Sequence, residues 1–82
     1  MPYVIVERTF TSPPSDADLT AAALREKPCL DIYGVAWRRS IVSADRLRMI
    51  CHYEAPDAES VRKVQREAGN PFERVWAGNV IE

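Results

Sequence analysis

The stretch from Cys51 to Trp76, CHYEAPDAESVRKVQREAGNPFERVW, carries the signals that decide the fold. An alternating apolar segment ends at Ala55-Pro56, and Asp57 follows at the position of a helix N-cap. Gly69-Asn70-Pro71 then ends the helical pattern before strand-like residues resume. The stretch therefore predicts a strand, a helix over residues 58–68 and a further strand, joined by short connections.

The rest of the chain shows the same kinds of signal. Residues 3–10 (YVIVERTF) are rich in Val, Ile and aromatic residues, which is typical of a strand. Ser15 is placed to cap a first helix, which we expect to end at Lys27 because Pro28 cannot continue it. A modest apolar stripe on this helix consists of Leu19, Ala22 and Ala23. The other strands are predicted at residues 34–42, 47–54 and 74–81, the first two as a hairpin.

This order of elements predicts an α+β protein with the ferredoxin-like βαββαβ arrangement. Right-handed crossovers place both helices on one face of a four-stranded antiparallel sheet, with the first and third strands in its centre. We expect residues 1–82 to form a single domain, since a chain of 82 residues has room for one core.

Alternation along the strands predicts which residues face the helices. In the third strand the helix-facing set is Leu47, Met49, Cys51 and Tyr53, and the opposite set is Arg48, Ile50, His52 and Glu54. In the second strand, regular alternation places Trp37, Arg39 and Ile41 on one side and Arg38 on the other, so that one arginine points to each face.

Composition and charge narrow the class of partner. A formal net charge of -1 argues against nucleic acid or an anionic membrane as partner, because both select for an excess of Lys and Arg. No apolar run approaches the length of about 20 residues that crosses a bilayer, and no signal peptide is evident, so we expect a cytoplasmic protein. Cys29 and Cys51 lack CxxC spacing, and we expect reduced thiols, with Cys51 in the core and Cys29 in a loop after Pro28.

The face of the sheet away from the helices carries apolar as well as charged residues. So short a chain has a thin core, because it buries only roughly 60 to 65 per cent of its unfolded surface. Association with a second copy would bury further apolar surface and is therefore favoured. We therefore predict a homodimer, built either as a sheet-on-sheet pair or as a dimeric α+β barrel.

The segments VERTF, SADRLRM, CHYEAP and AGNPFERVW, with the spacing of the two helices, resemble a small ferredoxin-like family long catalogued as a domain of unknown function. Some of its actinobacterial members are described as nickel-binding proteins. The resemblance covers nearly the whole chain and implies a ferredoxin-like subunit assembled as a dimer, with nickel or another divalent metal as the possible cofactor. The chain departs from the nickel-binding relatives in having a single histidine and Asn70 at a turn where they carry histidine.

His52 and Glu54 lie two residues apart on one strand face and are the candidate metal ligands. The alternative for His52 is a partly buried imidazole that hydrogen-bonds across an interface, although one histidine per chain can form a two-histidine site across a dimer axis. Glu7 sits in an apolar strand and needs a partner, for which Arg38 or Arg39 is the simplest candidate. The residues predicted to bind a ligand are Glu7, Trp37, Arg39 and Glu54.

These patterns support two functions. The first is a small dimeric ligand-binding protein for a metal ion or small molecule, and this is the interpretation we favour over an enzyme. The second is a cofactor-independent enzyme of the dimeric α+β barrel type, in which His52 acts as general base on an organic substrate and Arg38 or Arg39 holds the oxyanion. That enzyme requires a closed pocket of several hundred Å³ beside His52.

Overall fold

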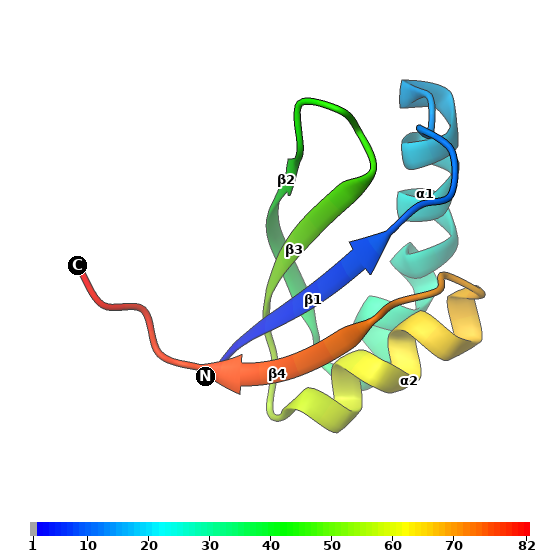
Figure 1. Ribbon diagram of the computed structural model, residues 1–82. Coiled ribbons are helices and arrows are strands. Elements are labelled where there is room, and N and C mark those ends of the chain that lie inside the picture. The colour runs from blue at the N-terminus through cyan, green and yellow to red at the C-terminus, as the bar shows by residue number, and fades with distance from the viewer. Residues whose placement is uncertain (1) are drawn as a thin grey trace.

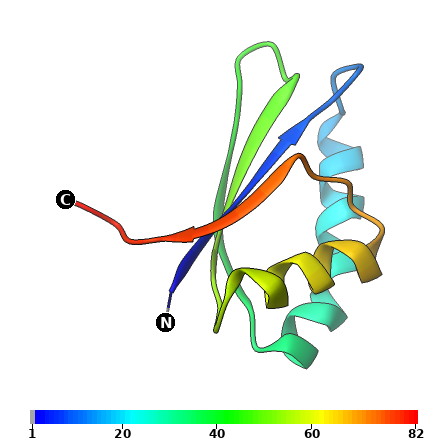
Figure 2. The ribbon, with the colours of Figure 1, turned by 60° about the horizontal axis from the view of Figure 1, so that its bottom comes forward.

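The computed structural model describes residues 2–82 and confirms the βαββαβ order (Figure 1). Its elements are β1 (Tyr3–Thr9), α1 (Asp16–Tyr33), β2 (Ala36–Val42), β3 (Arg48–Glu54), α2 (Ala58–Ala68) and β4 (Arg74–Gly78). The strands form one antiparallel sheet in the order β2-β3-β1-β4. Both helices lie on the same side of this sheet, as Figure 2 shows, so one face is covered and the other is open.

The core lies between the sheet and α2. Two valines each from β1 and α2 form its centre, and Cys51 and Tyr53 of β3 point into it as the alternation predicted. The buried hydrophobic residues of this cluster are Val4, Val6, Cys29, Val35, Cys51, Tyr53, Ala55, Val61, Val64 and Val75. The cluster is small, which agrees with the thin core expected of a short chain.

The prediction that the first helix ends at Lys27 is wrong. α1 continues through Pro28 to Tyr33, and Cys29 is therefore a buried helical residue and not part of an exposed loop. Proline inside a helix costs about 3 kcal/mol through a lost hydrogen bond and a clash with the preceding turn. Burial of Cys29 and the packing of Leu30 and Tyr33 against the core offset that cost.

Both helices end at glycines in the left-handed conformation. Gly34 has φ 64° and Gly69 has φ 73°, values that residues with a Cβ adopt only at a cost. After α1, Val35 N–H donates to Leu30 O at 2.9 Å, and after α2, Asn70 N–H donates to Gln65 O at 2.9 Å. These bonds satisfy carbonyls in the last turn of each helix and fix the direction in which the chain leaves it.

The alternation predicted for β2 is also wrong, because the strand contains a bulge. Trp37 pairs with Tyr53, but Arg39 pairs with His52, so Arg38 is an extra residue in the ladder. The bulge places Trp37 on the helix-covered face. Arg38 and Arg39 both lie on the open face, where Arg38 Nε donates to Glu54 Oε1 at 2.8 Å.

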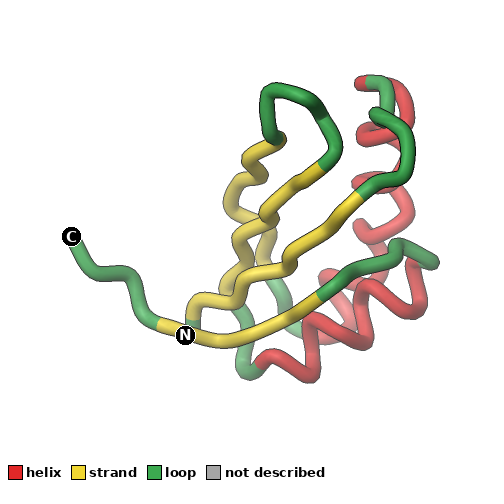
Figure 3. The backbone as a smooth tube through the Cα atoms, in the orientation of Figure 1, coloured by secondary structure: helices red, strands yellow, loops and turns green. Residues whose placement is uncertain are grey.

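The ends of the strands differ slightly from the sequence-based bounds. β4 ends at Gly78 and not at Ile81, and residues 79–82 extend from the sheet as a loop (Figure 3).

None of the helices within residues 2–82 is both long enough and apolar enough to cross a membrane.

Candidate functional site

The open face of the sheet gathers most of the candidate residues. Ladder pairing places Ile5 beside His52 and Glu7 beside Ile50, and Ile41 lies beyond Ile50 on β2. Four large apolar side chains lie on this face, and all but Ile5 are exposed to water. They are Ile5, Ile41, Ile50 and Trp76. Arginines and glutamates surround them, so the open face has an apolar centre and a charged rim.

His52 lies within this face and is held by Tyr3. The Tyr3 hydroxyl is 3.2 Å from His52 Nδ1, and the two rings meet edge to face with their centroids 5.4 Å apart. This contact occupies Nδ1 and leaves Nε2 as the nitrogen that can take a further ligand. Residues 2–82 contain no group of three His, Cys, Asp or Glu side chains that could hold a metal ion.

Glu54 is engaged with Arg38 and not with His52. Its hydrogen bond and ion pair with Arg38 hold the pKa of the Glu54 carboxyl below its usual range. Arg39 lies beside this pair, and a hollow of about 490 Å³ opens here. The hollow is lined by Tyr3, Arg38, Arg39, Glu54, Val80 and Glu82. Two positive charges beside Glu54 disfavour a metal cation and favour an anionic group in this hollow.

Glu7 lies nearer the β4 edge of the open face, and neither Arg38 nor Arg39 is its partner. Trp76 Nε1 donates to Glu7 Oε2 at 2.6 Å, and Arg74 Nη2 lies 3.3 Å from Glu7 Oε1. The structure thus brings Arg39, His52 and Glu54 to neighbouring positions, and it separates Glu7 from them.

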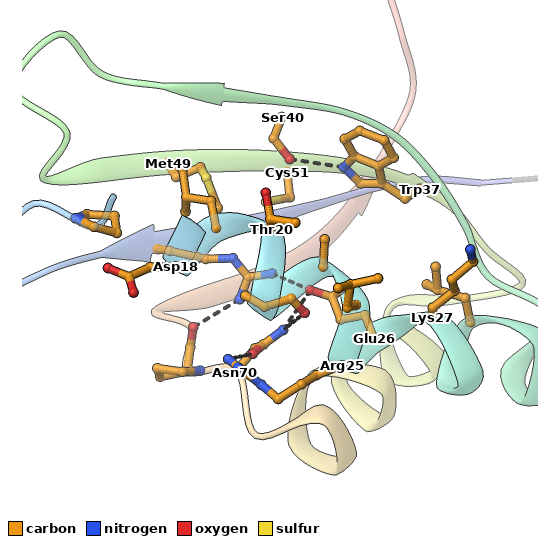
Figure 4. Close-up of a pocket in the computed structure, with 18 of the residues that line it drawn as sticks. Asp18, Thr20, Arg25, Glu26, Lys27, Trp37, Ser40, Met49, Cys51 and Asn70 are labelled. Atoms are coloured by element: carbon orange, nitrogen blue, oxygen red, sulfur yellow. Dashed lines mark hydrogen bonds and ion pairs between the residues drawn. The ribbon is translucent and has the colours of Figure 1, made fainter. Parts of the chain in front are cut away.

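A larger cavity, of about 650 Å³, opens on the other face of the sheet, between α1 and strands β2 and β3 (Figure 4). Trp37, Ser40, Met49, Cys51 and Tyr53 line it from the sheet side. Its position bears on the enzyme alternative, because the side chain of His52 alternates with those of Cys51 and Tyr53 and points away from the cavity. His52 therefore cannot act as a base on a molecule bound there.

The floor of this cavity is a buried polar network of Arg8, Glu26, Tyr53, Gln65 and Asn70. Arg8 Nη2 donates to Gln65 Oε1 at 2.7 Å and lies 3.5 Å from Glu26 Oε2. Glu26 also accepts from the Tyr53 hydroxyl at 2.6 Å and from Asn70 Nδ2 at 2.9 Å. Each member is at most 7% exposed, so charge and hydrogen-bonding capacity are enclosed beside an apolar space.

Burial governs the protonation of this network. Removal from water, followed by the proximity of the Glu26 carboxylate, raises the pKa of the Tyr53 phenol. For Arg8, burial alone lowers the pKa, but Cys51, Tyr53 and Glu26 reverse that effect, and its pKa is raised overall. Tyr53 therefore stays a hydrogen-bond donor to Glu26, and Arg8 stays a cation.

Sequence patterns did not single out Arg8, Glu26, Gln65 or Asn70 as site residues, although three of them left a signal. Arg8 shares its strand face with Val4 and Val6, and a charged residue at a core-facing position of a strand needs a buried partner. Gln65 likewise lies inside the apolar stripe of α2. Glu26 left a weaker signal: it follows Leu19, Ala22 and Ala23 at the next position of the same helical stripe, although α1 as a whole is only weakly amphipathic.

Comparison with known proteins places the chain in a family. A family model described as "Nickel responsive protein SCO4226-like" matches residues 3–77. The chain belongs to this family. In the crystal structure of SCO4226 from Streptomyces coelicolor A3(2), the same fold recurs with a TM-score of 0.87, at 15% sequence identity, over 98% of this chain and 99% of that one. No curated protein matches the chain significantly. Membership in the SCO4226-like family and the shared fold agree with the resemblance drawn from the sequence.

Proposed function

We propose that this protein is a homodimeric, nickel-responsive binding protein whose metal site is completed only when the open faces of two copies meet. The description of the family supplies the link to nickel. The observation that supports the placement is the position of His52, an imidazole held by Tyr3 within an apolar sheet face. Within residues 2–82 a single copy offers no three-ligand group, so further donors must come from a second copy or from water.

The open face has the properties of a surface that pairs with itself. Ile41 is 56%, Ile50 41% and Trp76 47% exposed, so large apolar side chains contact water in a single copy. Scattered exposed apolar residues are common, but a cluster on one sheet face favours an interface. The rim carries both arginines and glutamates, so an arginine of one copy can face a glutamate of the other twice in a two-fold symmetric pair.

The geometry around His52 suits a shared site. For Nε2 to bind a metal, the proton must sit on Nδ1, where the Tyr3 hydroxyl can accept it and orient the ring. Because β3 is a central strand, a two-fold axis near the middle of the sheet brings two His52 rings toward each other. Glu54 would have to exchange its bond with Arg38 for the metal, so we assign the main contribution to the imidazole.

Light scattering after size-exclusion chromatography tests the dimer. The wild-type protein should show twice the mass of one chain, and Ile50→Asp should show the mass of one chain because it buries a carboxylate in the interface. Ile32→Asp is the matched control, since Ile32 is 72% exposed on α1 and lies away from the open face. A wild-type monomer at micromolar concentration contradicts the proposal.

Isothermal titration with Ni²⁺ at about pH 7.5, where an ordinary imidazole is neutral, tests the metal site. We expect saturation at about one Ni²⁺ per two chains, because two imidazoles share one ion. The heat of binding should be lost in both His52→Ala and Ile50→Asp. Equal binding by wild type and His52→Ala would show that the metal, if bound, lies elsewhere.

A further inference from the structure

The N-terminal part of α1 does not pack against the sheet. Of the 18 residues of this helix, only Glu26 and Cys29 are buried. The apolar stripe predicted from the sequence is present, but Leu19, Ala22 and Ala23 line the large cavity and do not enter the core. The cavity thus lies between two apolar surfaces, one on α1 and one on the sheet. Within the described residues these two surfaces do not pack against each other.

The size and walls of this cavity suit a small organic molecule. Its volume of about 650 Å³ falls within the range of roughly 300–1,000 Å³ typical of ligand pockets. Trp37 lies on the sheet wall and is 53% exposed, and its Nε1 donates to Ser40 Oγ at 3.0 Å, which fixes the plane of the ring (Figure 4). Met49 lies on the same wall, and its sulfur makes favourable contacts with aromatic rings.

The polar network defines the chemistry at the floor. Arg8 Nη2 contacts Gln65, Tyr53 and Glu26, whereas Nη1 donates to Pro71 O and carries a second N–H that can donate to a ligand oxygen. Within residues 2–82 every buried polar side-chain atom has a partner, so an apolar guest leaves none of them unpaired. The charges of Arg8 and Glu26 balance each other, and a guest therefore needs no net charge of its own.

We propose that this cavity binds a planar, largely apolar and uncharged molecule that carries a carbonyl or hydroxyl oxygen. Its ring system lies against Trp37 and Met49, and its oxygen points toward the guanidinium of Arg8 at the floor. The bulge in β2 is what makes this site, because it turns Trp37 toward the helices and sends Arg38 and Arg39 to the open face. The site lies on the opposite side of the sheet from His52 and is independent of the proposed nickel site.

Tryptophan fluorescence tests the proposal, because the two tryptophans lie on opposite faces of the sheet. The probe is 1-acetonaphthone, a planar uncharged ketone that quenches an indole most strongly when the two rings are in contact. In the Trp76→Phe protein, Trp37 is the only reporter and quenching should be saturable. In the Trp37→Phe protein, Trp76 reports on the open face and should show only weak, non-saturable quenching.

Two substitutions on α1, made in the Trp76→Phe background, provide the matched comparison. Ala23→Phe places a ring in the cavity and should abolish saturable quenching, whereas Ala21→Phe, at an exposed position outside the lining, should leave it unchanged. 1-Ethylnaphthalene, which has a similar shape without the oxygen, serves as a competitor of the ketone. If Arg8 donates to the ketone, the hydrocarbon should bind about tenfold more weakly than the ketone.

The proposal is overturned by saturable quenching of Trp76 alone, by equal binding in the two α1 variants, or by no quenching of Trp37 up to the solubility limit of the probe. Equal affinity of the ketone and the hydrocarbon would overturn the role given to Arg8. None of these results depends on nickel or on dimer formation, so the fate of the nickel proposal is decided separately.

Discussion

Replacement of Glu26 by alanine is the most informative single perturbation of this protein. Glu26 accepts hydrogen bonds from Tyr53, Gln65 and Asn70 and is the ion-pair partner of Arg8. Removing it leaves a buried cation without its counter-charge and several buried donors without their acceptor. Breaking a buried ion pair costs about 3–5 kcal/mol. Because the adjacent cavity admits water to Arg8, we expect a loss at the lower end, about 3 kcal/mol.

That loss is a large fraction of the stability of a domain of this size, for which about 4–12 kcal/mol is typical. Urea unfolding followed by far-ultraviolet circular dichroism measures it. Glu59→Ala is the control, since Glu59 makes only surface ion pairs with Arg62 and Arg66 and should change stability by less than about 0.5 kcal/mol.

The double variant Arg8→Met/Glu26→Leu removes both charges and extends the test. It should be clearly more stable than the sum of the single losses predicts, because no uncompensated charge is left in the interior. A cost of no more than about 1 kcal/mol for Glu26→Ala would show that water reaches the network and that Arg8 does not need Glu26 as a buried counter-charge.

Three further predictions concern the helices. Pro28→Ala should stabilise the protein by about 2 kcal/mol, because the gain from a restored helical hydrogen bond exceeds the cost of a higher conformational entropy in the unfolded chain. An unchanged urea midpoint would mean that α1 accommodates the proline without strain. Gly69→Ala should destabilise by about 1 kcal/mol, because φ is 73° while a Cβ there meets nothing within 4 Å, so the cost is conformational and should appear in the same assay. The Ser60 backbone N–H, and then its side chain, lower the pKa of Asp57, so this carboxylate stabilises the fold at neutral pH and that contribution is lost as pH falls below about 4. Asp57→Asn keeps a capping side chain and should reduce the acid-induced drop in urea midpoint; an identical pH profile would contradict this assignment.

Local signals predicted the elements that the structure contains, apart from their ends. Asp57 accepts from the Ser60 backbone N–H as an N-cap should, and Gly69 ends α2 as expected. The prediction failed at Pro28, where local cost argued for a helix end and tertiary packing of Cys29 and Leu30 outweighed it. Propensity reflects only near neighbours along the chain, so it has no account of such packing.

For the candidate site, the sequence correctly placed His52 and Glu54 on the face away from the helices and Cys51 in the core. It grouped Trp37 with Arg39 and Ile41 on one side of the second strand, which is wrong, because a bulge changes the phase of alternation and cannot be recognised in a run such as AWRRSIV. It also missed the network under α1, whose members come from β1, α1, β3 and α2 and from the turn after α2.

By itself the sequence determined the order of elements, the helix caps and the inward face of β3, because each depends on residues a few positions apart. Only the tertiary structure decided that Arg8, Glu26 and Gln65 meet in the interior and that a cavity separates α1 from the sheet. These features depend on side chains far apart in the chain and on the angle at which a helix rests on a twisted sheet. Burial and pairing energies fix that arrangement, and they exist only after the chain has folded.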